Sequence, residues 1–197
     1  MKPFSEACEE NKQPILQVIQ PLFREARSLL EIGSGTGQHA VYFAAAMPGL
    51  TWQTSDCAEN LAGIQAWLAE ADLDNLPEPL ELDVQGLWPE QTYDAVFSAN
   101  TTHIMSWSAV ERMFQGLGRS LKSGGVFALY GPFNYRGTYT SESNRRFDRW
   151  LQARDPQSGI RDFEALQALA QEQGLIFLED VEMPVNNRIL VWRRLPA

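Results

Sequence analysis

The sequence predicts an α/β fold, in which helices cover both faces of an open, mostly parallel sheet of seven strands with one antiparallel C-terminal strand. Short apolar runs of strand length alternate with amphipathic helical segments along the chain. The first of these runs enters a glycine-rich turn, and the chain ends in two strands joined by the short segment 183–187. Strands that alternate with helices pair in parallel through right-handed crossovers, so their carboxyl ends meet at one edge of the sheet.

The expected helices follow from amphipathic spacing and from helix-terminating residues. The first has Ile15, Ile19 and Phe23 on one face, although Pro21 interrupts it. The helix before the fifth strand ends at the Ser-Gly-Gly segment 123–125. We expect helices at residues 11–27, 38–47, 59–71, 109–121, 144–153 and 163–173.

The expected strands are short apolar runs bounded by turn residues. They lie at residues 29–32, 51–55, 80–82, 93–98, 126–130, 175–182 and 189–194. The longest irregular stretch, 131–143, follows the fifth strand, and such loops in compact proteins are often lids or binding elements. No repeat, low-complexity tract or linker is present, which predicts one domain over residues 1–197.

The most informative segment is the turn after the first strand, which reads Glu-Ile-Gly-Ser-Gly-Thr-Gly from Glu31 to Gly37. Glycine allows a tight bend and lets a ligand approach the backbone closely. The carboxylate of Glu31 favours a guest with hydroxyl or ammonium groups over a pyrophosphate. The pattern resembles the first motif of class I S-adenosylmethionine (SAM)-dependent methyltransferases, which implies that Glu31, Gly33, Ser34, Gly35 and Gly37 contact SAM.

Two other interpretations of this turn remain open. From Gly35 the chain also spells Gly-Thr-Gly-Gln-His-Ala, which fits the dinucleotide fingerprint. A glycine-rich turn can also be purely structural. Dinucleotide enzymes usually need a further substrate-binding region, and no second domain is evident in this sequence. An NAD-dependent oxidoreductase is therefore the less favoured hypothesis.

Polar residues also close the next three strands, at the edge where open parallel sheets bind ligands. Asp56 is spaced to accept hydrogen bonds from ribose hydroxyls, which is the favoured interpretation, and a cap for the following helix is the alternative. Asp83 and the backbone of Val84 suit an adenine, with loop capping as the alternative. Asn100 suits the methionine moiety or a turn. These four residues complete the predicted SAM site.

The resemblance extends over nearly the whole chain. The sequence is similar to the uncharacterised methyltransferase family called domain of unknown function 938, which includes methyltransferase-like protein 26. The matching segments are Glu10 to Leu16, Glu31 to Gly37, Gly131 to Phe133, Thr140 to Asn144 with Phe147-Asp148, Gly159 to Asp162, and Met183 to Asn187. The resemblance implies a Rossmann-like methyltransferase fold, SAM as cofactor and S-adenosylhomocysteine (SAH) as product, but no substrate. Val185 stands where alanine is expected.

Methyl transfer requires an aligned nucleophile, and a base only where that nucleophile carries a proton. His103, after the fourth strand, is the candidate base, because its ordinary pKa is closest to neutrality. Alternatively it packs against Trp107 and shapes the pocket, and His39 is expected to be packed or solvated. The candidate substrate residues are Trp107, Tyr130, Phe133, Asn134, Asn144, Asp148, Asn186 and Asn187. The last four could instead cap a helix or form a tight turn.

Composition narrows the partners and the compartment. The net charge of −9 and the absence of a basic stripe argue against nucleic acid as substrate. No apolar run of about 18 residues and no signal-peptide pattern is present, so we expect a cytoplasmic protein without membrane contact. Cys8 and Cys57 have no metal-site spacing, so no metal is expected.

The sequence thus favours a SAM-dependent methyltransferase acting on a small, polar acceptor. A protein that binds SAM or SAH as a regulatory or interaction module, without turnover, remains the alternative. The sequence does not fix the oligomeric state or the acceptor.

Overall fold

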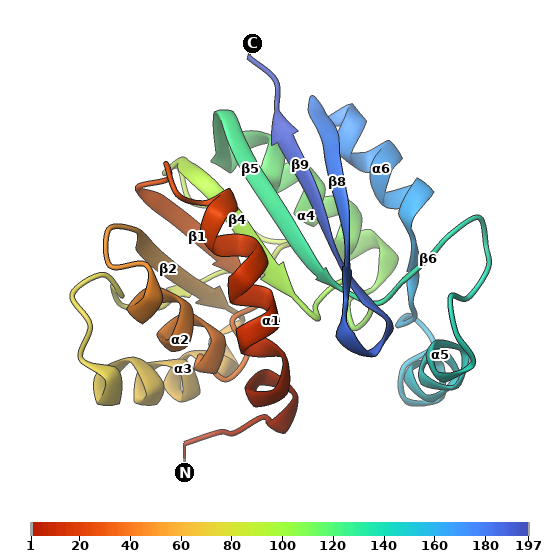
Figure 1. Cartoon of the computed structure of the whole chain (residues 1–197), viewed down its shortest axis with the longest axis horizontal. Helices are drawn as coiled ribbons and strands as arrows, with labels where there is room; N and C mark the ends of the chain where they lie inside the picture. The colour runs from red at the N-terminus through yellow and green to blue at the C-terminus, as the bar shows by residue number, and fades with distance from the viewer. Residues whose placement is uncertain (1, 197) are drawn as a thin grey trace.

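The computed structural model describes residues 2–196 and is built around a seven-stranded sheet with strand order β3-β2-β1-β4-β5-β9-β8 (Figure 1). Strand β9 is antiparallel to both of its neighbours, and the other pairs are parallel. The predicted fold class is therefore confirmed. The strands are β1 Ser28–Ile32, β2 Thr51–Asp56, β3 Leu80–Glu81, β4 Tyr93–Ala99, β5 Leu121–Gly131, β8 Leu175–Met183 and β9 Asn187–Arg194.

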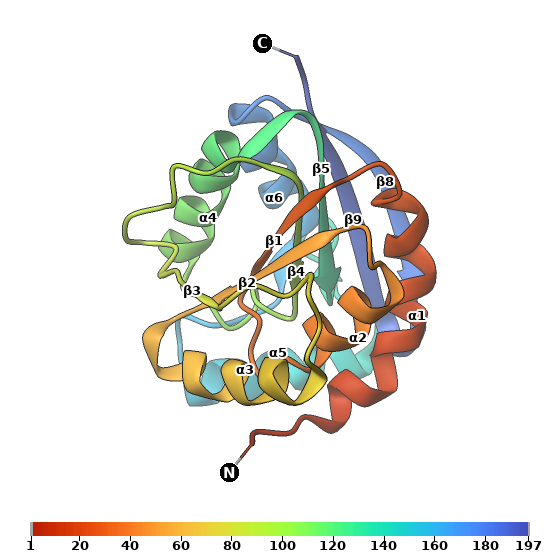
Figure 2. The ribbon, with the colours of Figure 1, turned by 90° about the vertical axis from the view of Figure 1, so that its left-hand side faces the viewer.

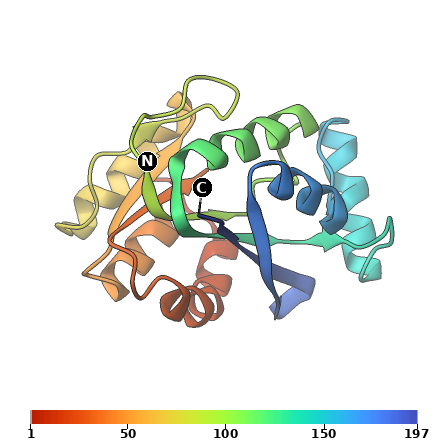
Figure 3. The same cartoon turned by 90° about the horizontal axis from the view of Figure 1, so that it is seen from above.

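Helices cover both faces of the sheet, because neighbouring residues of a buried strand point to opposite sides. Leu29 packs with α1 and α2, whereas Leu30 packs with α4 and α6. Figures 2 and 3 show these two helical layers on either side of the strands. The helices are α1 Glu6–Leu22, α2 Gln38–Ala46, α3 Ala58–Ala71, α4 Trp107–Ser120, α5 Glu142–Arg154 and α6 Phe163–Glu172, with a 3-10 turn, η1, at Pro184–Asn186.

The first helix begins and ends earlier than the sequence predicted. It starts after Ser5, whose Oγ accepts a hydrogen bond from the backbone N–H of Cys8 at 3.3 Å. Both Pro14 and Pro21 lie inside the helix, so Pro21 does not interrupt it. The apolar spacing that guided the prediction begins only at Ile15, because the first turns of the helix are polar.

The stretch 131–143 is also more ordered than expected. It contains the short strand β6, Phe133–Asn134, which pairs in parallel with β7, Arg161–Asp162. Two-residue strands have no periodicity that a sequence could reveal. The remaining boundaries differ from the expected ones by a few residues, and the largest change is at β5, which begins at Leu121 instead of Val126.

Candidate functional site

A cavity of about 800 Å³ lies at the carboxyl edge of the parallel strands. In Figure 1 this is the lower edge of the sheet, where α1, α5 and the β8–β9 turn converge. Of the predicted site residues, ten line the cavity. They are Glu31, Gly33, Ser34, Gly35, Asp56, Asn100, His103, Tyr130, Asn144 and Asn187.

The three glycines of the turn have different local requirements. All have positive φ, but a Cβ on Gly33 would lie 2.5 Å from the side chain of Thr101, and one on Gly37 would lie 3.2 Å from the Cα of Ile64. A Cβ on Gly35 would meet no protein atom within 4 Å, although Gly35 lines the cavity. Packing therefore excludes a side chain at Gly33 and crowds one at Gly37, whereas Gly35 leaves open a cradle that a Cβ would fill.

Glu31 is a buried acid at the base of this turn. Its Oε2 accepts hydrogen bonds from Ser34 Oγ at 2.8 Å and from Trp52 Nε1 at 3.0 Å. Burial raises the pKa of Glu31 to about 7, the charge of Asp56 adds to the increase, and the two hydrogen bonds oppose it. A cationic ligand in the cavity would favour the ionised form.

Asp56 connects the glycine turn to the helix after β2. Its Oδ2 accepts the backbone N–H of Gly35 at 2.7 Å, and its Oδ1 accepts the N–H of Cys57 and the Nδ2 of Asn60, both at 2.8 Å. Asp56 is only 9% exposed yet lines the cavity. It therefore caps the local backbone, as one of its two interpretations supposed, and its contact with a ligand stays a prediction.

The other two strand ends differ from each other. Asn100 has a φ of 58°, donates its backbone N–H to the carbonyl of Tyr130 at 2.9 Å and lines the cavity. Asp83 caps its own loop, since its Oδ1 accepts the N–H of Gln85 at 2.9 Å, and Val84 is buried in the core. Neither Asp83 nor Val84 lines the cavity, but the charge of Asp83 helps to raise the pKa of Cys57, which does.

His103 is 5% exposed, lines the cavity and packs edge-to-face on Phe147. Its buried Nδ1 has no hydrogen-bond partner in the described structure. Burial, together with the charge of Arg161, lowers the pKa of His103 to about 4. The ring is therefore neutral near pH 7, which is the form that accepts a proton.

Three further predicted substrate residues lie along the cavity. The hydroxyl of Tyr130 faces the side-chain amides of Asn11 and Asn187, and burial raises its pKa. Asn144 Nδ2 donates to Thr140 Oγ1 at 3.0 Å and to the backbone carbonyl of Asn186 at 3.3 Å. Asn144 thus connects α5 to the turn between β8 and β9.

The other predicted site residues do not line the cavity. Trp107 begins α4, Phe133 lies in the core, and Gly37 packs between α2 and α3. Asn134 is buried, with its Oδ1 unpartnered among the described residues. Asp148 accepts hydrogen bonds from Tyr139 Oη, Gln152 Nε2 and the N–H of Ile160, and Asn186 donates to Ser143 Oγ. These two hold the rim of the cavity together.

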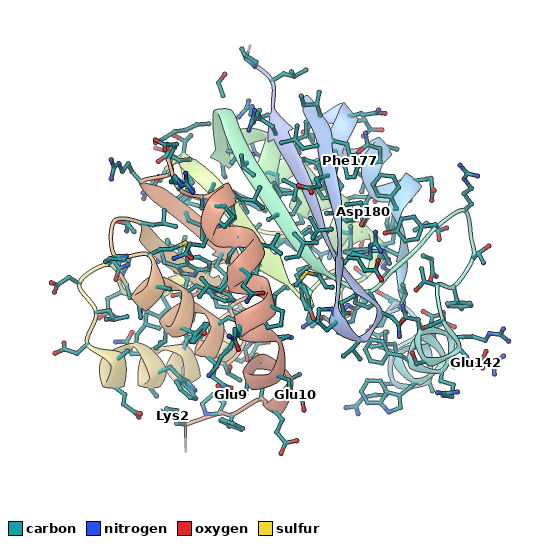
Figure 4. The ribbon with its side chains drawn as sticks, viewed as in Figure 1. Lys2, Glu9, Glu10, Glu142, Phe177 and Asp180 are labelled. Atoms are coloured by element: carbon teal, nitrogen blue, oxygen red, sulfur yellow. The ribbon has the colours of Figure 1, made fainter. Side chains whose placement is uncertain are left out.

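Sequence reasoning missed two parts of the cavity wall, and the first is a face of α1. Glu10, Asn11 and Pro14 lie on this face, and Figure 4 labels Glu10 beside the lower turns of the helix. Asn11 Oδ1 contacts His39 Nε2 at 2.6 Å, which agrees with a packed role for His39. Pro14 has no N–H, so the carbonyl of Glu10 lacks its usual helical donor. The sequence signal for this wall was the family resemblance over Glu10 to Leu16, but no role was predicted for that segment.

The second part of the cavity wall that sequence reasoning missed is apolar. Its members are Ile104, Met105, Pro132, Phe147, Pro184 and Val185. Val185 is 82% exposed and has a φ of 60°, which is rare for a β-branched residue. Such strain is commonly found at functional sites.

Within residues 2–196, no group of three or more His, Cys, Asp or Glu side chains is arranged to hold a metal ion. Over the same range, no helix has the length and apolar character needed to cross a bilayer.

Comparisons with known proteins agree with this architecture. An O-methyltransferase family protein from Burkholderia thailandensis superposes with a TM-score of 0.84 at 15% identity, covering 94% of this chain and 57% of that one. The SAM-dependent methyltransferase SibL superposes with a TM-score of 0.81 at 19% identity, covering 96% of this chain and 56% of that one. The structure of PigF with SAH superposes with a TM-score of 0.80 at 16% identity, covering 93% of this chain and 54% of that one. The chain thus spans a little over half the length of these proteins, and the likeness shows the fold.

The family profile described as "Protein of unknown function (DUF938)" matches residues 2–194, which is nearly the whole chain. The chain therefore belongs to the DUF938 family and has the class I SAM-dependent methyltransferase fold.

Proposed function

We propose that the protein transfers a methyl group from SAM to a small acceptor bound in the same cavity. The observation that carries the proposal is the position of Gly35. A Cβ added to Gly35 would point into open space within the cavity, next to Glu31 and Asp56. At Gly33 and Gly37, by contrast, neighbouring residues occupy the space that a Cβ would need. A turn shaped in this way suits a ligand that lies directly against the backbone.

The residues of the cavity fit the chemical groups of SAM. The carboxylates of Glu31 and Asp56 suit its positive charge and its ribose hydroxyls, and Asn100 suits its amino acid portion. SAM supplies a methyl group bonded to a positively charged sulfur. The chain's own contribution is to hold that group against an acceptor and to exclude water.

His103 is the proposed general base. Its ring is neutral near pH 7, and the residue lines the cavity. An O–H or N–H nucleophile would give its proton to the imidazole of His103 as its new bond to the methyl carbon replaces the bond from that carbon to sulfur, and SAH would leave as the neutral thioether. An acceptor without such a proton would need only alignment.

The apolar wall favours an acceptor with an apolar body and one polar reacting atom. Ile104, Phe147 and Val185 would contact the body, while Tyr130, Asn144 and Asn187 offer polar contacts. Such a mixture of apolar walls and a few placed polar groups is typical of small-molecule sites. This refines the small polar acceptor expected from the sequence.

The second candidate is a protein that binds SAM or SAH without turnover. The hydrogen bond from Asn144 on α5 to the turn between β8 and β9 favours this second candidate only if that rim of the cavity stays closed to an acceptor. Incubation of the purified protein with SAM and fractionated small-molecule extract separates the two candidates. Conversion of SAM to SAH with at least one fraction supports the transferase, and conversion with none, in a protein that binds SAM, supports the binding protein.

A further inference from the structure

The turn that carries His103 is held by one short segment of the chain. The carbonyls of four consecutive residues, 102–105, each accept a hydrogen bond from residues 158–161. Arg161 Nε donates to the carbonyl of Thr102 at 3.1 Å, and Arg161 Nη2 donates to that of Met105. The N–H of Gly159 donates to the carbonyl of His103 at 2.9 Å, and Ser158 Oγ donates to that of Ile104 at 3.2 Å.

The segment is fixed in turn to the helix that forms the other side of the His103 pocket. Asp148 on α5 accepts the N–H of Ile160 at 2.7 Å and is buried. Tyr139 and Gln152 donate to the same carboxylate, at 2.6 Å and 2.9 Å. The network therefore joins the turn that carries His103 to α5, and Phe147 on α5 packs on the His103 ring.

Arg161 is the central member of this network. Its half-buried guanidinium bonds three backbone carbonyls, the third being that of Gln157 at 2.7 Å, and lies 5.9 Å from the ring of Trp107. The guanidinium is a rigid fork of donors, which a lysine cannot reproduce. Arg161 on β7 and Asp148 on α5 are the charged side chains of this network, and the charge of Asp148 also acts on Arg161.

We propose that Arg161 is a positioning residue for methyl transfer, because it fixes the turn that carries His103. The inference rests on the proposed role of His103 as base. A mobile turn would move the His103 ring relative to the acceptor. Arg161 opposes this movement through its hydrogen bonds to the carbonyls of Thr102 and Met105.

The two histidines of the chain make a direct test possible. In the full-length protein with labelled histidine, NMR follows the titration of both imidazoles in the wild type and in Arg161→Gln. We expect His103 to titrate about one pH unit higher in the variant, because a nearby positive charge has been removed. His39 bonds to α1 and should titrate as in the wild type.

The control is Arg146→Gln, which removes an exposed positive charge from α5 next to Phe147. It should leave both titrations unchanged. An unchanged His103 titration in a folded Arg161→Gln protein would overturn the proposal. An equal shift of both histidines would also overturn it, since that outcome indicates general loosening.

If Arg161→Gln does not fold, Arg161→Lys provides the test. It keeps the charge but not the fork, so His103 should titrate as in the wild type while the amide of Gly159 exchanges faster with solvent. Wild-type exchange at Gly159 would contradict the proposal. Calorimetry with SAH keeps the two claims apart: wild-type protein without SAH binding refutes the proposed function, whereas these titrations concern Arg161 alone.

Discussion

Gly35 donates its backbone N–H to the carboxylate of Asp56 at 2.7 Å, and this bond joins the glycine turn after β1 to the end of β2. Both residues line the cavity. The bond fixes the open side of Gly35 at the place where a ligand can lie against the backbone. This relationship explains why the three glycines of the turn are expected to respond differently to substitution.

Gly35→Ala should reduce SAH affinity by about tenfold or more while costing about 1 kcal/mol of stability, since alanine tolerates positive φ poorly. Gly33→Ala should instead destabilise the fold by about 2 kcal/mol or more, because its Cβ would lie 2.5 Å from Thr101. Calorimetric titration and denaturant unfolding measure the two effects. If Gly35→Ala binds SAH like the wild type, the ligand does not lie against this turn.

Glu31 should make stability depend on pH in an unusual direction. Its pKa is raised to about 7, so between about pH 4.5 and 7 the folded state holds a proton that the unfolded state has lost. Stability due to Glu31 is therefore present at low pH and lost as the pH rises through about 7. The change amounts to about 3 kcal/mol over this window.

His39 and His103, whose pKa values are both lowered to about 4, act in the opposite direction, so the measurement is the difference between wild type and Glu31→Gln. Relative to Glu31→Gln, the wild type should become less stable as the pH increases from about 4.5 to about 7. A constant difference across this range would show that Glu31 titrates normally.

The same acid should link SAM binding to pH. A cationic ligand favours ionised Glu31, so SAM affinity should increase as the pH rises toward about 7 and then level off. Glu31→Gln should bind SAM more weakly and lose this dependence. Calorimetry at several pH values is the measurement, and an equal pH dependence in both proteins would exclude Glu31 as its source.

His103→Ala should leave SAH affinity nearly unchanged and reduce turnover by about a hundredfold or more, the usual range for a general base. Asn144→Ala should have a smaller effect of the same kind, because it loosens the contact between α5 and the β8–β9 turn. SAH formation with an active extract fraction gives the rates. Loss of SAH binding in both variants would indicate that His103 and Asn144 bind the cofactor or support the fold. Unchanged turnover in both variants would indicate that the acceptor binds elsewhere.

Nucleic acid should not bind with specificity or high affinity, because the net charge is −9. Gel-shift assays at physiological salt should show no complex below micromolar concentration. A submicromolar complex whose affinity falls steeply with added salt would be the contrary result.

The sheet and the ends of its strands could be predicted from the sequence because each depends on local pattern. Glu31, Asp56 and Asn100 follow apolar runs directly, and the parallel arrangement then brings them to one edge. Asp83 follows the same rule but caps its own loop. A strand-end position alone does not distinguish the two outcomes.

Contacts between distant segments could not be predicted. Asp148 and Asn144 are four residues apart on one helix, which suggested a shared role, yet Asp148 supports Ile160 while Asn144 lines the cavity. Arg161 reaches a turn more than fifty residues earlier in the chain. Such pairings depend on tertiary packing, and the local periodicity of a single sequence does not show which distant residues will be in contact.

The most direct test of the account is calorimetric titration of the full-length protein with SAM, SAH and NAD under identical conditions. The proposed site predicts saturable binding of SAM and SAH, because Glu31 and Asp56 favour positive charge and hydroxyl groups, and no binding of NAD, whose pyrophosphate they repel. Binding of NAD together with no heat from SAM or SAH would contradict the central claim.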